Sequence, residues 1–276
     1  MCVLLVFKYR QMTKYKIQKF PKSRIATLDI CEIGKRKHHV TGLIELDISK
    51  SREKIRQYNR NSSTKISFTA WIINVICSTI SKYETPSSYL KGKNKLIIFD
   101  DINVSIIVEK DINGQKVPIP LIIEKANEIS IEAISIQINN AKNKQLTNND
   151  IVLQKKADRL ERIYYMLPGF LRRSVWKYIL RHPKLAFSKI GNVAVTSIGM
   201  MGQIKGWFIP ISIHPICFGL GSIIKKPIII DDKIEIREML NMSILIDHDV
   251  IDGAIMARFI NELTKNIENG MNLGVC

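Results

Sequence analysis

One segment near the carboxyl end of the chain is the most informative, and it reads Ser243-Ile-Leu-Ile-Asp-His-Asp-Val-Ile-Asp-Gly-Ala254. Its apolar run has the length and composition of a buried strand that ends at Asp247. We expect His248 and Asp252 to follow in a turn and Gly253 to begin a helix. Imidazole is well suited to take up a proton near neutral pH, and a carboxylate four residues later can hold the turn or orient the ring. On these residues alone, a structural hydrogen-bonding histidine is favoured over a catalytic base.

The hydrophobic pattern outside this segment mixes helices and strands without strict alternation. Apolar residues at helical spacing predict helices, and alternating or short apolar runs predict strands. Pro118 and Pro120 place their strand at an edge or an irregularity of a sheet. We therefore expect one α/β domain built on a mixed sheet. The predicted helices are 50–60, with Ser49 as the N-cap, 67–83, 130–142 and 254–267, and the predicted strands are 44–48, 96–99, 102–109, 117–124, 193–198, 207–212, 216–220, 227–230 and 242–246.

The charge of the chain is its unusual property. Of the 276 residues, 46% are hydrophobic and 24% are charged, which is ordinary for a globular protein and argues against a disordered chain. The formal net charge of +17 is concentrated in Lys8–Arg24, with seven basic residues and no acidic one, and in Lys155–Lys189, with ten against two. Such charge suits phosphate-bearing small molecules or acidic lipid. A nucleic-acid partner is not expected, because no helix-turn-helix, RNP-type or zinc-finger motif accompanies the charge.

The second basic stretch, residues 155–189, also has apolar residues at helical spacing, interrupted at Pro168-Gly169. A basic amphipathic helix of this kind can bind an anionic membrane surface or a partner protein. The alternative is a surface helix whose apolar stripe packs on the core, which is the commoner case and the interpretation that the sequence favours.

The ends of the chain and its cysteines bear on location and domain organisation. No apolar run approaches the roughly 20 residues that cross a bilayer, and the opening residues 1–7 are too short for a signal peptide. The five cysteines form no C-x-x-C pair or Cys/His cluster, so neither a metal site nor a disulfide framework is expected. We expect an intracellular, cytoplasmic protein with a basic tail over 1–20 and a folded domain over 21–276. Met12 is an alternative to Met1 as the start.

Further segments join the first in a resemblance to the catalytic domain of the dihydrolipoamide acyltransferases, the core component of 2-oxoacid dehydrogenase complexes. Gly191-Asn-Val-Ala-Val-Thr-Ser-Ile-Gly-Met-Met-Gly202 resembles the family's Gly-Thr-Phe-Thr-Ile-Ser-Asn-Leu-Gly stretch. Cys217-Phe-Gly-Leu-Gly-Ser-Ile-Ile-Lys-Lys-Pro227 resembles its Leu-Gly-x-Gly strand and the Lys-Pro that follows. The resemblance covers about residues 21–270 in order. It implies a chloramphenicol acetyltransferase-like fold, a two-layer α/β sandwich in which a mixed β-sheet carries helices on one face.

The resemblance also implies roles for individual residues. His248 matches the catalytic base and Asp252 the structural carboxylate. Thr196 falls where the family places a hydroxyl, usually that of a serine, which stabilises the tetrahedral intermediate, and Ser197 is the fallback candidate. Arg36 resembles an arginine that pairs with the motif carboxylate in chloramphenicol acetyltransferase, although the basic run around it is equally well interpreted as solvated charge.

The activity that the resemblance implies is acyl transfer between coenzyme A, as a substrate, and a thiol acceptor such as dihydrolipoamide. No cofactor is covalently bound, and the phosphates of coenzyme A account for part of the positive charge. The family's site lies between subunits of a homotrimer. Two departures bear on membership of a large complex: a lipoyl domain is not expected, so another protein would supply the lipoyl group, and Asp249 stands where complex-forming enzymes usually have arginine. The alternatives are O-acetyl transfer to a small hydroxyl acceptor and a non-catalytic scaffold or membrane-peripheral subunit.

Overall fold

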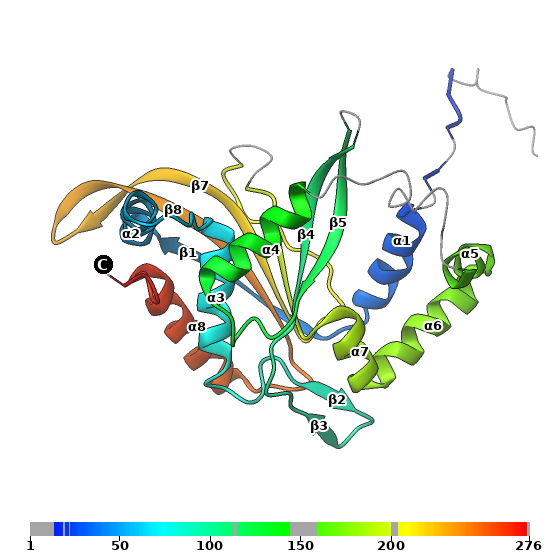
Figure 1. The fold of residues 1–276 in the computed structure, drawn as a ribbon. Helices are drawn as coiled ribbons and strands as arrows, with labels where there is room; N and C mark the ends of the chain where they lie inside the picture. The colour runs from blue at the N-terminus through cyan, green and yellow to red at the C-terminus, as the bar shows by residue number, and fades with distance from the viewer. Residues whose placement is uncertain are drawn as a thin grey trace, which may run out of the picture.

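The computed structural model describes residues 14–18, 20–21, 23–112, 115–143, 159–199 and 204–274. Most of the predicted basic tail and Met12 lie outside these residues. The centre of the fold is a six-stranded sheet in the order β1-β8-β7-β6-β4-β5 (Figure 1). β6 runs parallel to β4 and β7, and the remaining pairs are antiparallel, so the sheet is mixed, as predicted. Its strands are β1 (His39–Asp47), β4 (Val104–Ile112), β5 (Gln115–Ile123), β6 (Val193–Ser197), β7 (Ile216–Ile230) and β8 (Lys233–Asp247).

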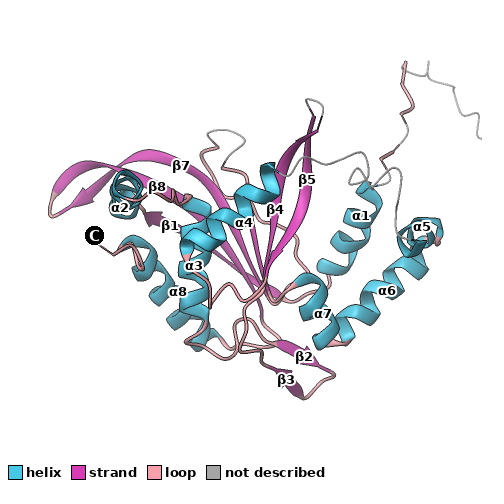
Figure 2. Ribbon diagram, viewed as in Figure 1, coloured by secondary structure: helices cyan, strands magenta, loops and turns pink. Residues whose placement is uncertain are grey.

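The helices form two groups around the sheet (Figure 2). Helices α2, α3, α4 and α8 pack on one another and on the sheet, which gives the predicted two-layer α/β sandwich. Helices α1, α5, α6 and α7 form a second group, in which α6 packs on α1 and α7. The bounds are α1 (Ser23–Gly34), α2 (Ser49–Asn61), α3 (Phe68–Ile80), α4 (Ile131–Asn143), α5 (Arg159–Met166), α6 (Gly169–Arg181), α7 (Pro183–Ile190) and α8 (Gly253–Glu268).

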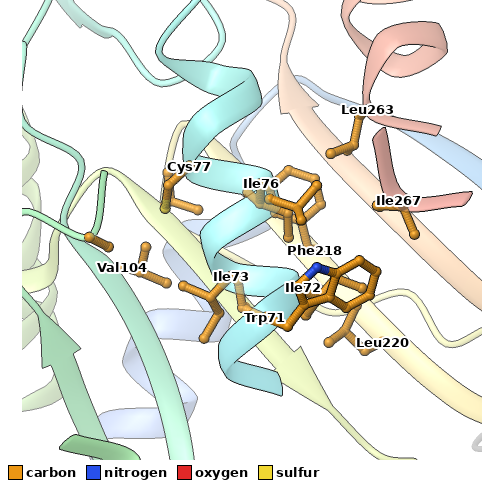
Figure 3. Packing of buried hydrophobic residues seen from close by; sticks show 14 of the residues in the cluster. Trp71, Ile72, Ile73, Ile76, Cys77, Val104, Phe218, Leu220, Leu263 and Ile267 are labelled. Atoms are coloured by element: carbon orange, nitrogen blue, oxygen red, sulfur yellow. The ribbon is translucent and has the colours of Figure 1, made fainter. Parts of the chain in front are cut away.

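Helix α3 is the centre of the hydrophobic core. It is apolar on nearly every side because α4 and α8 flank it and the sheet lies beneath it. The side chains of Trp71 and Ile76 are fully buried, and Figure 3 shows them close to Phe218 of β7 and Leu263 of α8. Burying one such side chain stabilises the fold by about 1.5–3 kcal/mol. The helix begins one residue after the predicted start at Ser67, whose side chain caps it by accepting a hydrogen bond from the backbone N–H of Ala70.

Two local predictions are wrong, and hydrogen bonds explain both. Ser49 does not cap α2 but begins it, and its Oγ instead accepts a hydrogen bond from the backbone N–H of Glu238 at 2.7 Å. The apolar segment 207–212 forms no strand, although it has strand-like composition. It crosses the sheet instead: Ser243 Oγ donates to the backbone oxygen of Phe208 at 2.6 Å, and Trp207 Nε1 donates to that of Ile44 at 3.0 Å.

The strands near the carboxyl end are longer than predicted. Residues 216–220 and 227–230 belong to one strand, β7, because a register shift between Leu220 and Ile223 absorbs the irregularity that the glycines suggest. β8 likewise begins at Lys233, well before the predicted start at residue 242. Asp231 and Asp232 both have positive φ angles, 47° and 60°, and this backbone geometry closes tight two-residue hairpins. The result is a long β7–β8 hairpin that extends past the other strands (Figure 1).

Other elements differ in smaller ways. The sequence patterns did not predict α1 or β2 (Tyr89–Lys91). The predicted strand over 96–99 corresponds to β3 (Lys95–Ile97), which pairs with β2 in a separate small sheet. β5 does lie at the sheet edge, as Pro118 and Pro120 predict. The basic stretch is helical and interrupted near Pro168, but α6 has no buried residue. The favoured interpretation, in which its apolar stripe packs on the core, is therefore wrong for α6.

Candidate active site

The His248 side chain stands on a short turn between β8 and α8, and buried residues fix this turn. Val250 and Ile251 are 7% and 4% exposed, whereas His248 is exposed. The backbone N–H of His248 donates to the backbone oxygen of His38 at 2.9 Å, and that of Val250 donates to Asp247 at 3.1 Å. The turn is thus held in place while the ring faces solvent, as a base that must meet an external substrate requires.

Asp252 caps the helix that follows. Its Oδ1 accepts hydrogen bonds from the backbone N–H groups of Ala254 at 2.9 Å and Ile255 at 3.0 Å. Such a cap contributes about 1 kcal/mol, and the helix begins at Gly253, as predicted. Within the described part of the chain, no side chain is hydrogen-bonded to the His248 ring. Asp252 therefore holds the turn and does not orient the imidazole in the single chain.

The residues just before β1 are bonded to the same turn. His39 lies opposite Asp247 in the β1–β8 pairing, which brings Lys37 within reach. Lys37 Nζ lies 2.6 Å from Oδ2 of Asp247, whose side chain is only 2% exposed. His38 Nδ1 lies 2.9 Å from Asp249 Oδ1, and this hydrogen bond raises the pKa of His38. Because an unpaired buried carboxylate is costly, the Lys37 ion pair fixes the strand end that precedes the turn.

Two further imidazoles link the segments near the turn. His39 Nε2 lies 2.9 Å from the backbone oxygen of His214. His214 Nε2 lies 2.9 Å from that of Ile190, and His214 Nδ1 lies 3.1 Å from Ser212 Oγ. Burial lowers the pKa of both rings, that of His214 to about 4. Both are neutral at pH 7, and their hydrogen bonds join β1 to the segment before β7 and to the end of α7.

Arg36 does not make the ion pair that the resemblance implies. Its Nη2 lies 3.3 Å from Glu32 Oε1 on an exposed surface. Oδ1 of Asp252 accepts hydrogen bonds from the backbone N–H groups at the start of α8 instead. The cation that reaches the turn is the next residue, Lys37, whose partner Asp247 lies 210 positions away. The sequence carries no signal for this pair, because only the register of β1 against β8 creates it.

Strand β6 presents the two candidate hydroxyls on opposite faces of the sheet. Side chains alternate along a strand, and Val195, which is 3% exposed, belongs to the helix-covered core. Ser197 shares that face and borders a cavity of about 480 Å³. Thr196 is on the other face, beside Gly219 of β7. The cavity is lined by Arg52, Phe68, Thr69, Ser197, Gly199, Leu220, Gly221, Ser222, Ile223 and Leu240.

Thr196 and His248 of one chain lie far apart. Thr196 is paired across the sheet with Gly219 of β7, and Gly219 is paired in turn with Ser243 of β8. His248 follows Ser243 by five residues, or about 17 Å along the strand, and two strand spacings add about 10 Å across the sheet. The separation is therefore about 20 Å. If one reacting carbonyl contacts both a Thr196 hydroxyl and a His248 ring, these two groups must belong to different chains.

The described residues offer no metal-binding cluster, and they bury two of their three cysteine thiols. They contain no cluster of His, Cys, Asp and Glu side chains that could hold a metal ion. No helix among them has the length and apolar character needed to cross a membrane. The thiols of Cys77 and Cys217 are buried, and burial raises the pKa of both, that of Cys217 to about 12. These thiols are therefore unreactive at neutral pH.

Solved structures share this architecture over almost the whole chain. A probable dihydrolipoamide acetyltransferase from Listeria monocytogenes superposes with a TM-score of 0.68, at 20% identity, over 95% of this chain and 98% of that one. A dihydrolipoamide acetyltransferase from Azotobacter vinelandii gives 0.64, at 15% identity, over 92% of each chain. The description of the latter concerns the catalytic role of a serine, a histidine 52 residues later and an asparagine four residues after that.

Sequence comparison gives relatives of the same kind. The acetyltransferase component of the pyruvate dehydrogenase complex of Mycoplasma genitalium is 26% identical over 257 residues, or 89% of this chain and 57% of the relative. The Staphylococcus epidermidis component is 25% identical over 238 residues, or 84% and 46%. The chain thus spans about half the length of these curated relatives.

The mixed sheet with its helix layer, and the likeness to these solved cores, define a chloramphenicol acetyltransferase-like α/β sandwich of the acyltransferase class. The model of the 2-oxoacid dehydrogenase acyltransferase catalytic domain matches residues 34–152 and 183–275. The chain therefore belongs to the family of 2-oxoacid dehydrogenase acyltransferases, as the motifs predict. The match leaves out residues 153–182, which include the whole of α5 and α6.

Proposed function

We propose that this chain transfers an acyl group between coenzyme A and a thiol acceptor such as a dihydrolipoyl group, with His248 as the general base. The observation that carries the proposal is the exposed His248 ring on a turn that Val250, Ile251 and the Lys37 ion pair hold in place. A base must be both accessible to the substrate and held in a reactive position. Family membership supplies the acyl-transfer chemistry.

Residue spacing supports the roles of Thr196 and Asp252. The Azotobacter enzyme has its serine 52 residues before its histidine. The residue 52 positions before His248 is Thr196, not Ser197. The asparagine four residues after that histidine corresponds in position to Asp252. Threonine keeps the hydroxyl, and aspartate keeps the ability to cap α8.

The chemistry assigned to His248 is proton transfer. A free thiol has a pKa of about 8.5, so only a few per cent is thiolate at pH 7. His248 removes the thiol proton as the sulfur attacks the thioester carbonyl, and the C–S bond that forms gives a tetrahedral oxyanion. When the intermediate collapses, the other C–S bond breaks and the imidazolium returns its proton to the leaving thiolate. Such a base accelerates reactions by about 10²–10⁴-fold.

The Thr196 hydroxyl is assigned to the oxyanion. It lies on the face of the sheet opposite the helix layer, where it can donate a hydrogen bond to a carbonyl approaching that face. One donor of this type is worth about 10²–10³ in rate. Because Thr196 and His248 of one chain are separated by about 20 Å, the complete site combines His248 of one protomer with Thr196 of another.

Exposed apolar surface supports a homotrimer or larger assembly. Ile229, Ile234 and Ile236 on the projecting β7–β8 hairpin are 73%, 77% and 76% exposed. On the sheet face that carries Thr196, Leu43 and Ile107 are 48% and 60% exposed. Large apolar side chains exposed on a hairpin and on a sheet face are typical of surfaces that a further subunit covers. One solved relative is described as the cubic core of a pyruvate dehydrogenase complex, and its assembly is a precedent for this proposal.

The substrates follow from the same chemistry. Coenzyme A carries several phosphate charges, which a chain of net charge +17 attracts. We assign the lipoyl group to another protein, which presents it to the site as a substrate.

The test is thioester exchange by the full chain, with acetyl-coenzyme A as donor and free dihydrolipoamide as acceptor. We expect turnover, and we expect His248→Ala to reduce it by about 10²–10⁴-fold. His182→Ala is the matched control, because it removes another exposed imidazole, whose Nδ1 lies 2.7 Å from the backbone oxygen of Tyr178, and it should retain most of the activity.

Two results would contradict the proposal. Equal rates for wild type and His248→Ala would remove the assigned base. Acetyl transfer to small hydroxyl acceptors with no transfer to thiols would instead indicate an O-acetyltransferase, and no turnover with any acceptor would indicate a scaffold.

A further inference from the structure

Helix α6 and the end of α5 expose an unusual number of large apolar side chains. No residue of α6 is buried. Phe170 and Tyr178 of α6 are 61% and 59% exposed, and Met166 of α5 is 84% exposed. Leu171, Val175 and Tyr178 follow one another at intervals of four and three residues, which places them on one side of the helix. We call this surface, made of Ile163, Met166, Phe170, Leu171, Val175 and Tyr178, the α6 face.

The α6 face belongs to a strongly basic stretch of the chain. Between Ile163 and Ile190 the chain has six basic residues and no acidic one. Lys177, Arg181, Lys184 and Lys189 are exposed, and none of them has an ion-pair partner among the residues that the structure describes. Any partner that covers the α6 face must therefore supply both apolar contact and negative charge.

The opposite side of α6 is firmly attached to the protein. The Asp29 carboxylate of α1 is 3% exposed, and its Oδ2 accepts hydrogen bonds from Arg172 Nε at 2.7 Å and from the Tyr164 hydroxyl at 3.0 Å. Trp176 Nε1 donates to the same Tyr164 hydroxyl at 2.9 Å. These contacts fix which side of α6 faces α1, so the apolar side is presented outward and not left exposed by loose packing. Figure 1 shows α5 and α6 at the margin of the molecule away from α2 and α8.

The α6 face also lies outside the residues that the family model matches. The family model matches residues 34–152 and resumes at residue 183, so it excludes the whole face. A stretch that the family model does not match, yet that packs on α1 and is apolar on its outer side, indicates an additional binding role.

We infer that the α6 face binds the surface of an anionic phospholipid membrane. Exposed apolar side chains flanked by lysine and arginine are the pattern of helices that lie in a membrane interface. A second copy of the chain fits less well, because a symmetric contact would bring the same cations face to face. Nucleic acid would match the charge but would leave aliphatic side chains such as Met166 and Val175 without apolar contact.

Helix α2 provides an internal comparison within the same molecule. It is also 13 residues long and basic, with Lys50, Lys54 and Arg60 among its residues. It buries Ile55 in the core, and this fully described helix has no exposed large apolar side chain. α2 is thus an ordinary surface helix, and α6 differs from it in its apolar surface rather than in charge alone.

The test is co-sedimentation of the full chain with phosphatidylcholine vesicles, with or without phosphatidylglycerol. We expect binding only to the vesicles that contain phosphatidylglycerol, and weaker binding at high salt. Phe170→Ser with Tyr178→Ser should weaken binding about tenfold by removing apolar contact, and Lys177→Glu with Arg181→Glu should weaken it at least tenfold. Circular dichroism of each variant checks that the fold is retained.

The matched control is Lys50→Glu with Arg60→Glu on α2, which changes the net charge by the same amount. Binding within about twofold of wild type would support the α6 face as the contact site. An equal loss in the α2 variant would overturn the inference, because net charge alone would then explain binding. It would also be overturned by equal binding to neutral vesicles, by no binding to any vesicle, or by single-stranded nucleic acid displacing the chain from the vesicles.

Discussion

The turn after β8 and helix α6 both carry charged side chains, but their surroundings differ. At the turn, Asp247 is paired with Lys37, and Asp252 accepts two backbone hydrogen bonds. On α6 the outward cations Lys177 and Arg181 have no ion-pair partner in the described residues. Matched charges fix a geometry, which a catalytic base needs, whereas unmatched charges beside apolar surface remain available to a partner. The comparison predicts large effects for substitutions around the turn and small effects on the fold for substitutions on α6.

The largest expected effect concerns the hydroxyl on β6. Thr196→Val keeps the shape of the side chain and removes the donor, so we expect thioester exchange to fall by about 10²–10³-fold with little change in KM. Steady-state kinetics with acetyl-coenzyme A and dihydrolipoamide measures the rate of exchange and the KM of both proteins. Ser197→Ala is the control, because Ser197 lies on the opposite face of the sheet. If Ser197→Ala proved the more damaging of the two, the assignment of the oxyanion donor would be wrong.

The ion pair under the turn gives the next effect. Lys37→Met leaves the buried Asp247 carboxylate without its cation, and we expect a loss of about 3 kcal/mol in the free energy of unfolding. Lys177→Met on α6 removes an exposed, unpaired cation and should change stability by less than about 0.5 kcal/mol. Urea denaturation of both variants measures the contrast. Similar losses would mean that the Lys37 pair contributes no more than a surface charge.

Acid should destabilise the fold through the imidazoles near the turn. Burial lowers the pKa of His214 to about 4 and also lowers that of His39. Below about pH 6.5 His214 becomes protonated in the unfolded chain but stays neutral in the native protein. Its contribution to the free energy of unfolding is therefore fully present above pH 7 and is lost as the pH falls towards 4. For His214 we expect a loss of at most about 2 kcal/mol at pH 5 relative to pH 7.5. Comparing the two pH values by urea denaturation, in wild type and His214→Gln, isolates this residue, and an identical pH dependence would refute the assignment.

The smallest effect concerns the cap of α8. Asp252→Ala removes both backbone contacts and should cost about 1 kcal/mol in unfolding free energy, with reduced activity because the turn is less well held. Asp252→Asn retains the cap and should stay close to wild type in stability. Thermal denaturation compares the two. A large loss of activity in Asp252→Asn at unchanged stability would show that the charge acts on the reaction itself.

The sequence predicted the parts of the site that are local. The turn with His248, the cap residue Asp252 and the start of α8 at Gly253 lie within a few positions of one another, so spacing alone describes them. The Lys37–Asp247 pair was missed because its members are 210 residues apart. Arg36 instead lies beside Glu32, because one position along the segment before β1 decides which cation reaches the turn.

The fold was predicted to a similar extent. Regular helices such as α3 and α4 were found from their apolar spacing. β7 was divided in two because Gly221 and Pro227 are signals of a strand end, which a register shift here overrides. The segment 207–212 was taken for a strand because it is apolar, but it lies across a sheet instead of within one. The exposure of α6 could not be predicted, because helical spacing shows that a helix has an apolar side and not what covers it.

Mixed assembly of two inactive variants tests the central claim most directly. A protein with His248→Ala has no base and one with Thr196→Val has no oxyanion donor, so each alone should be nearly inactive in thioester exchange. If the site combines His248 and Thr196 from different protomers, unfolding the two together and refolding them should restore about a quarter of the sites. Activity that reappears only in the refolded mixture is the result that we predict. No recovery in mixed oligomers, with both variants shown to assemble, would contradict a shared site built on His248.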